Sequence, residues 1–392
     1  MNKNNFSMVI DYGSSSLRLG VFNESLDNLY ISSKSISEKN NYEEHFNSIK
    51  FLIKEAEKKI SNHLDNITVL YDSPEIYSID LSIKKNFDQK IFIKDVYSSI
   101  ILEANQLIKN NHINKKIIHI ISTNIIIDGK ELETNLDNNI KAKSIILEIK
   151  FVCLSLEKFN NILSVFKKNN LQVLNFYCSS YVKSLSYINS FNENELIGFL
   201  DIGYEKSIFL LFFKNRLFFI KTIPIGGNHI TKDISNVMKL NIYDSENIKK
   251  LFNKSENEFS YNEDSNENKD FINSILDKDI SVVTLKQVIL SRVEEIFDLV
   301  FKDSIILNQL SNNINFPLVL IGNGSKLFNK NIFHLNDEFN FKEIIFYNET
   351  DLGICEAAIH SEVNLKKNDI NIIQKSAKKY GIFEKFFNFF GK

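Results

Sequence analysis

Two aspartates, Asp11 and Asp201, stand in the same short pattern in the two halves of the chain. In each copy an apolar run reaches the aspartate, a glycine follows two positions later (Gly13 or Gly203), and apolar residues then resume. A carboxylate at such a turn can hold a hydrated divalent cation, and the backbone N–H groups of the turn can receive phosphate oxygens. Two facing copies would form a phosphate-binding cleft, whereas a single Asp-x-Gly is most often an ordinary hairpin turn.

The elements that would position these turns alternate between strands and helices. Each Asp-x-Gly copy predicts a β-hairpin, the first over residues 8–22 and the second ending near residue 220. The other predicted elements are a helix over 44–62, short strands within 66–94, a helix over 95–110 capped by Asp95, strands over 116–127 and 145–154, helices over 156–169 and 285–308, a strand over 317–321 and a short helix over 353–360. A polar, acidic segment over 253–270 is predicted to be a solvated loop.

The bulk composition excludes several classes of protein. With 392 residues the chain has room for two or more domains, and its net charge of −2 gives no electrostatic footprint for nucleic acid. The three cysteines are widely spaced, which argues against a disulfide framework or a zinc site and favours a reducing compartment. We expect neither a secretory signal nor a membrane-spanning helix.

The last twelve residues, 381–392, predict an amphipathic helix. At about 100° per residue, its apolar side chains fall within one arc of about 160°. These side chains are Ile382, Phe383, Phe386, Phe387, Phe389 and Phe390. So short a helix is marginal in water, and its aromatic face suits a bilayer interface, with packing on the protein's own core as the alternative. One copy would bind a membrane reversibly, and several copies on a polymer would bind more tightly through avidity.

Several motifs, taken in order, resemble the actin-like superfamily and, within it, the FtsA family of bacterial cell-division proteins. They are the two Asp-x-Gly hairpins, Pro-Ile-Gly-Gly-Asn-His-Ile-Thr over 224–231, Ser-Arg-Val-Glu-Glu-Ile over 291–296 and Ile-Gly-Asn-Gly over 321–324. The resemblance extends over nearly the entire chain. It implies an α/β, actin-like (ribonuclease H-like) two-domain fold with a nucleotide cleft and an FtsA-type inserted subdomain.

The resemblance also implies subdomain borders. They are 1–78 plus 165–190 for subdomain 1A, 79–164 for the inserted subdomain 1C, 191–234 plus 301–360 for 2A, 235–300 for 2B, 361–380 for a linker and 381–392 for a membrane-targeting helix.

By the same resemblance the ligand is ATP with Mg²⁺, and Asp11 and Asp201 would reach the metal through water. The implied nucleotide contacts are Asp11, Gly13, Ser14, Ser15 and Ser16 in a first phosphate loop, Asp201 and Gly203 in a second, Gly322, Asn323, Gly324 and Ser325 at the adenosine, and Arg292 with Glu295 on a helix beside the nucleoside. The second loop departs from the family pattern, because Tyr204, Glu205 and Lys206 stand where small residues are usual. Tyr204 and Glu205 leave less room for phosphate, and the glutamate adds negative charge. Lys206 could offset this by contacting a phosphate, with a solvated turn lysine as the alternative. No catalytic residue is evident, so we expect at most a weak ATPase.

The implied function is that of an adaptor. Such a protein would tether the tubulin-like division protein FtsZ to the cytoplasmic face of the cell membrane at the septum, self-associate into filaments and meet later division proteins. Three alternatives remain open at this point: a pilus-assembly adaptor of the PilM kind, an actin-fold scaffold that binds no nucleotide, and an actin-fold kinase or hydrolase acting on a small substrate. The last would need fuller phosphate loops and a base near the cleft.

Overall fold

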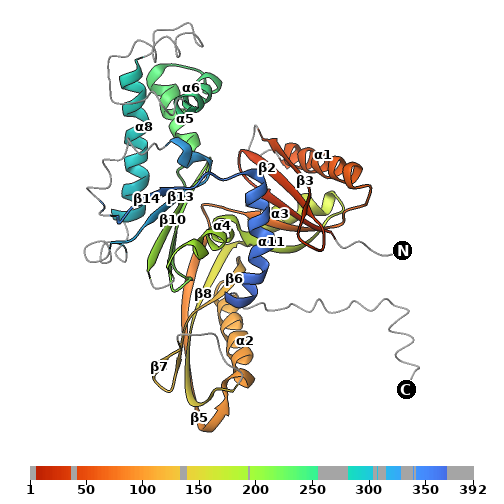
Figure 1. Cartoon of the computed structure of the whole chain (residues 1–392), viewed down its shortest axis with the longest axis vertical. Helices are drawn as coiled ribbons and strands as arrows, with labels where there is room; N and C mark the ends of the chain where they lie inside the picture. The colour runs from red at the N-terminus through yellow and green to blue at the C-terminus, as the bar shows by residue number, and fades with distance from the viewer. Residues whose placement is uncertain are drawn as a thin grey trace.

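The computed structural model describes residues 6–36, 42–132, 139–192, 195–254, 281–302, 307, 315–327, 339 and 341–368. Most of the predicted acidic segment and the whole predicted C-terminal helix lie outside these residues. The described part of the chain forms three β-sheets with helices packed around them (Figure 1).

The first five-stranded sheet contains the first Asp-x-Gly hairpin and has the order β3-β2-β1-β4-β9. Its strands are Ser7–Tyr12 (β1), Ser16–Phe22 (β2), Asn28–Ser35 (β3), Asn66–Tyr71 (β4) and Gln172–Cys178 (β9). The strands β1 to β3 form an antiparallel meander, and β4 and β9 continue the sheet in parallel with β1. The helices α1 (Tyr42–Ile60) and α3 (Leu156–Lys168) pack together beside this sheet.

The second five-stranded sheet repeats this design, with the order β12-β11-β10-β13-β14. Its strands are Leu196–Ile202 (β10), Ser207–Phe213 (β11), Arg216–Ile223 (β12), Leu318–Ile321 (β13) and Ile344–Phe346 (β14). Again three antiparallel strands are followed by two parallel ones. The associated helices are α5 (Gly227–Met238), α6 (Ile242–Lys254) and α8 (Val282–Phe297), and a π-helical turn, Asp298–Lys302, continues α8.

A third sheet, with the order β5-β8-β6-β7, projects below the other two in Figure 1. It consists of Tyr77–Phe92 (β5), Lys115–Ile127 (β6), Lys130–Glu131 (β7) and Lys141–Ser155 (β8), with α2 (Ile93–Asn111) beside it. The predicted short strands after residue 76 are instead one 16-residue strand, because β5 pairs with β8 along most of its length.

Two predicted helix boundaries are wrong. The cap of α2 is Phe92, without a side-chain hydrogen bond, and Asp95 lies inside the first turn, where its charge still suits the helix dipole. The predicted short helix over 353–360 is longer and extends over Asp351–Asn368 (α11).

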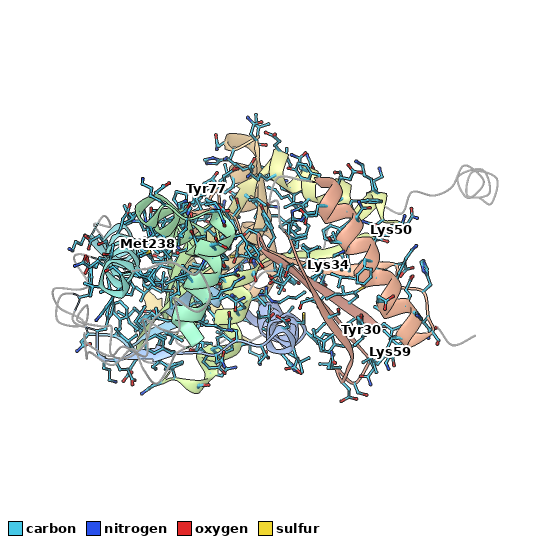
Figure 2. All side chains as sticks on the ribbon, turned by 90° about the horizontal axis from the view of Figure 1, so that it is seen from above. Tyr30, Lys34, Lys50, Lys59, Tyr77 and Met238 are labelled. Carbon is cyan, nitrogen blue, oxygen red and sulfur yellow. The ribbon has the colours of Figure 1, made fainter. Side chains whose placement is uncertain are left out.

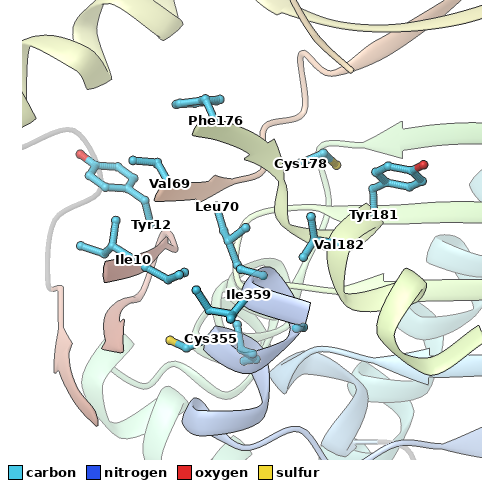
Figure 3. Close-up of a cluster of buried hydrophobic side chains, with 14 of the residues drawn as sticks. Ile10, Tyr12, Val69, Leu70, Phe176, Cys178, Tyr181, Val182, Cys355 and Ile359 are labelled. Atoms are coloured by element: carbon cyan, nitrogen blue, oxygen red, sulfur yellow. The ribbon is translucent and has the colours of Figure 1, made fainter. Parts of the chain in front are cut away.

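Two helices connect the five-stranded sheets. The helix α4 (Ser179–Tyr187) follows β9 and contacts both β9 and β11, and α11 contacts α4, β1 and β2. Buried side chains from both sheets and both helices form one continuous hydrophobic cluster. Figure 3 shows part of it, with Cys355 and Ile359 of α11 below Leu70 of β4. Figure 2 shows the two halves from above, with Met238 on one and Lys34 and Lys59 on the other.

Candidate functional site

The two Asp-x-Gly turns have the same geometry and line one cavity. The N–H of Gly13 donates to the carbonyl of Ser16 at 3.1 Å, and the N–H of Gly203 donates to the carbonyl of Lys206 at 2.9 Å. The cavity has a volume of about 80 Å³. The predicted residues that line it are Asp11, Gly13, Ser14, Ser15, Ser16, Asp201, Gly203, Gly322 and Asn323.

The other predicted residues lie beside this cavity or away from it. Ser325 is buried and donates its hydroxyl to the Gly322 carbonyl at 2.6 Å. Gly324 packs against Ile202. The structure places Arg292 and Glu295 on α8, in a separate depression formed with α5, where Arg292 is paired with Glu295 and with Asp233.

The first aspartate is bound by cationic and hydroxyl groups of the protein itself. Arg18 stands opposite Asp11 in the β1–β2 register and donates to its Oδ2 at 2.7 Å. The same guanidinium donates through Nε to Asp351, at the start of α11, at 2.6 Å. The hydroxyl of Ser179 donates to Asp11 Oδ1 at 2.9 Å. Asp11 thus has a partner on β2 and another on α4.

The second aspartate is bound in the same way. Lys183, buried on α4, lies 2.5 Å from Asp201 Oδ2 and 3.2 Å from Glu349 Oε2. The Ser180 hydroxyl lies 2.7 Å from Asp201 Oδ2 and 2.6 Å from Asp72 Oδ2, so its single proton is shared between the two carboxylates. Glu349 also accepts the N–H of Gly322 at 2.8 Å and the hydroxyl of Tyr187 at 3.3 Å. One lysine therefore connects α4, β10 and the segment that leads into α11.

The electrostatics of this group follow from burial and proximity. Burial alone would lower the pKa of Lys183, but Asp201 and Glu349 raise it well above its ordinary value. Burial would raise the pKa of Asp201, and Lys183 reverses that effect and lowers it. Burial raises the pKa of Glu349, the more distant of the two carboxylates, against the opposing effect of Lys183. The firmest ion pair is Lys183 with Asp201.

The Gly-Gly-Asn-His segment at the start of α5 holds the second turn in place. The N–H of Gly227 donates to the Gly203 carbonyl at 2.9 Å, and the N–H of Asn228 donates to the Tyr204 carbonyl at 2.7 Å. The side chain of Asn228 donates to Glu205 at 2.9 Å. The free N–H groups of this helix end, which in other settings bind anions, are here used within the protein.

The side chains that complete the site were missed in the sequence. Arg18, Lys183 and Glu349 bind the aspartates or their neighbours. Arg18 has a signal, because a hairpin that turns at Gly13 and Ser16 places residue 18 across from residue 11. No sequence signal marks Lys183 and Glu349, because 166 positions separate them in the chain.

The residues do not fit a bound Mg-ATP in the arrangement seen. Both carboxylates that would hold the hydrated metal are paired with cationic side chains. A cavity of about 80 Å³ is also far below the roughly 300 Å³ at which ligand pockets begin. Within the described residues, no cluster of three or more His, Cys, Asp or Glu side chains is arranged for a metal ion.

Among the described residues, none of the helices has both the length and the apolar sequence that a bilayer crossing needs.

Comparison with known proteins gives one family. The sequence model of the family described as "Cell division protein FtsA" matches residues 199–375. Over that segment the chain is similar to FtsA. A relative from Bacillus subtilis (strain 168), "Cell division protein FtsA", is 22% identical over 222 residues, which are 55% of this chain. The match spans about half of that relative, 48% of its length.

Solved structures show the fold. The PilM-PilN type IV pilus biogenesis complex aligns with a TM-score of 0.59 at 12% identity, over 92% of this chain and 97% of the other. MreB5 of Spiroplasma citri bound to ADP aligns with a TM-score of 0.52 at 12% identity, over 93% and 98%. The predicted actin-like fold is therefore confirmed, and at these identities the likeness extends to the fold alone.

Proposed function

We propose that this FtsA-like chain is a cell-division adaptor that tethers FtsZ to the inner face of the cytoplasmic membrane and helps to assemble the septal ring. The match of the FtsA family over residues 199–375 carries this proposal. That part of the chain includes the second hairpin, the Gly-Gly segment of α5 and α11. The subdomain borders predicted from the sequence, self-association into filaments and contact with later division proteins are parts of the same proposal.

The membrane contact is assigned to residues 381–392. Phenylalanines on one face of a short helix gain free energy by entering a bilayer interface, and folding the helix offsets part of that gain. A single helix would therefore bind reversibly. Adaptors joined into a filament would present many helices at once, so the attachment would strengthen as the filament grows. ATP with Mg²⁺, which the family resemblance predicts, is not part of this proposal, because Asp11 and Asp201 are paired with Arg18 and Lys183.

Sedimentation with liposomes tests the proposal. The full chain, a version ending at Lys379 and the variant F386N/F390N are mixed with anionic liposomes, with and without purified FtsZ. We expect only the full chain to pellet and to carry FtsZ with it, because the other two lack the apolar face. The variant E384N/K385N, changed on the opposite face, is the matched control and should pellet with the liposomes.

Two results would contradict the proposal. If all versions stay in solution, the last helix does not bind membranes. If the full chain pellets without retaining FtsZ, the partner is another protein, and a pilus-type adaptor or a scaffold becomes the better hypothesis.

A further inference from the structure

We infer that the cleft between the two five-stranded sheets is closed by the protein's own ion pairs, which join the two halves in place of Mg-ATP. The inference concerns the cleft alone and does not depend on a role in division. Four carboxylates and three cationic side chains line the cavity. The carboxylates are Asp11, Asp72, Asp201 and Glu349, and the cations are Arg18, Lys183 and Lys206.

The cationic groups take the positions next to the two aspartates of the turns. Arg18 contacts Asp11 at 2.7 Å, and Lys183 contacts Asp201 at 2.5 Å. A hydrated Mg²⁺ would need carboxylate oxygens free to accept from its water ligands. The second oxygen of Asp11 already accepts from Ser179, and at Asp201 both Lys183 and the Ser180 hydroxyl lie against Oδ2. At Asp11 and at Oδ2 of Asp201, a metal-bound water would therefore compete with charge-assisted hydrogen bonds, the strongest kind in a protein.

The same contacts disfavour a polyphosphate. Arg18 and Lys183 are already bound to carboxylates, and the carboxylates outnumber the cations around the cavity. If a phosphate took Lys183, the buried Asp201 and Glu349 would lose their shared partner, and leaving a buried charge unpaired is costly.

The glycines near the cleft serve the packing of the second turn. A Cβ on Gly322 would lie 2.3 Å from Asp201 Oδ1, and one on Gly324 would lie 2.6 Å from the carbonyl oxygen of Ile202. Gly322 also has a positive φ of 85°, which glycine adopts readily. The space next to these glycines is therefore filled by Asp201 and Ile202 of the protein itself.

The ion pairs replace the connecting role of a bound nucleotide. Lys183 lies on the helix that follows the first sheet, and its partners lie on β10 of the second sheet and just before α11. Arg18 on β2 reaches Asp351 at the start of α11. The buried Lys183 and the partly buried Arg18 thus connect segments that only folding brings together, and the halves stay joined without a ligand.

The first test uses the wild-type protein, with Mg-ATP as the probe. Thermal unfolding is measured with none and with up to millimolar Mg-ATP, and titration calorimetry is run on the same sample. A ligand that binds only the folded state must raise the unfolding midpoint, so we expect no shift and no binding heat. A saturable upward shift or a measurable heat would overturn the inference, and this test needs no variant to fold.

The second test asks whether Lys183 connects the halves. The variant K183M should lower the unfolding midpoint by several degrees, because it leaves two buried carboxylates without their cation. The matched control K342M removes an exposed pair with Glu195 and should leave the midpoint nearly unchanged. The triple variant K183M/D201N/E349Q, which removes the charges together, should recover part of the loss. Equal midpoints for K183M and K342M, or no recovery in the triple variant, would overturn the connecting role.

Discussion

At the scale of single residues, the arrangement around Lys183 determines how the protein responds to pH. The buried ammonium group of Lys183 forms ion pairs with two carboxylates at unequal distances, 2.5 Å for Asp201 and 3.2 Å for Glu349. The nearer carboxylate is held ionised, and the farther one is driven by burial towards its protonated form. Asp201 and Glu349 thus contribute with opposite signs to the pH dependence of the free energy of unfolding.

We predict that the Asp201 pair contributes stability that is lost in acid. The pKa of Asp201 in the folded protein is lowered by Lys183 against the effect of burial, so this stability is fully present above the unfolded-state pKa of about 4. It disappears as the pH falls through the lower folded-state pKa. In D201N the free energy of unfolding at pH 7 should fall by about 2–3 kcal/mol, and its further decrease below about pH 4 should be shallower.

Urea unfolding between pH 2 and pH 8, taken at about half-unit steps, measures this difference. The matched control is D88N, which removes an exposed carboxylate on β5 and should stay within about 0.5 kcal/mol of wild type at each pH. If D201N and wild type keep parallel pH profiles, Asp201 does not titrate as its contacts require.

The residues of the site were only partly predictable from the sequence. Asp11 and Asp201 stand out because their pattern is repeated, and the structure brings both to one cavity. Glu349 and Lys183 carry no local pattern, because a lysine on a short helix and a glutamate before another helix look like surface residues. Their burial results from the crossing of α4 and α11 between the sheets, which is a long-range property.

At the scale of elements, the second turn depends on the start of α5. A Cβ on Gly226 would lie 2.5 Å from the Gly203 carbonyl oxygen and 2.7 Å from the Lys206 nitrogen. A Cβ on Gly227 would meet Lys249 Nζ at 3.6 Å and the Gly203 carbonyl oxygen at 3.7 Å, which are ordinary contacts. Two adjacent glycines of one motif therefore have different roles.

We predict that G226A destabilises the protein by about 1–3 kcal/mol, because the added methyl group forces α5 away from residues 203–206. G227A is the matched control and should be neutral or slightly stabilising, since alanine suits a helix better than glycine does. Denaturant unfolding of both variants measures the difference. Equal losses for the two would mean that the contact with the second turn does not determine the position of α5.

The elements themselves were more predictable than their ends. Both hairpins and the helices from α1 to α3 follow the periodicity of their apolar residues. The length of β5 was not visible, because polar residues interrupt its outer part and its extent depends on pairing with β8. The predicted α11 was too short, and the contacts of this helix with β1, β2 and α4 are long-range ones that its own sequence does not reveal.

At the scale of the whole molecule, the buried side chains form three clusters of different reach. The largest includes residues of both five-stranded sheets, such as Leu19 of β2 and Phe199 of β10. A second lies within the half that contains α5 and α8. The third belongs to the projecting sheet and α2, and includes Leu147 of β8. The two five-stranded sheets thus share a core, and most of the projecting sheet has its own.

This arrangement of the buried clusters predicts two levels of cooperativity in unfolding. The five-stranded sheets should unfold together, since neither can open without exposing the shared cluster to water. The outer part of the projecting sheet should open at a lower free energy, because its cluster is smaller and its strands extend away from the other sheets. Native-state hydrogen exchange followed by mass spectrometry resolves the two levels as separate groups of peptides.

Two matched leucine-to-alanine substitutions test directly whether the clusters unfold separately. Leu147 and Leu19 are both fully buried strand leucines, so each change to alanine should cost about 2–5 kcal/mol at its own site. L147A should accelerate exchange in β5, β6 and β8 and leave β1 and β10 unchanged. L19A should accelerate exchange in β1 and β10 alike, because its cluster spans both sheets. If L19A affected only the first sheet, the two halves would be independent folding units, and the ion pairs of the cleft would then be their principal connection.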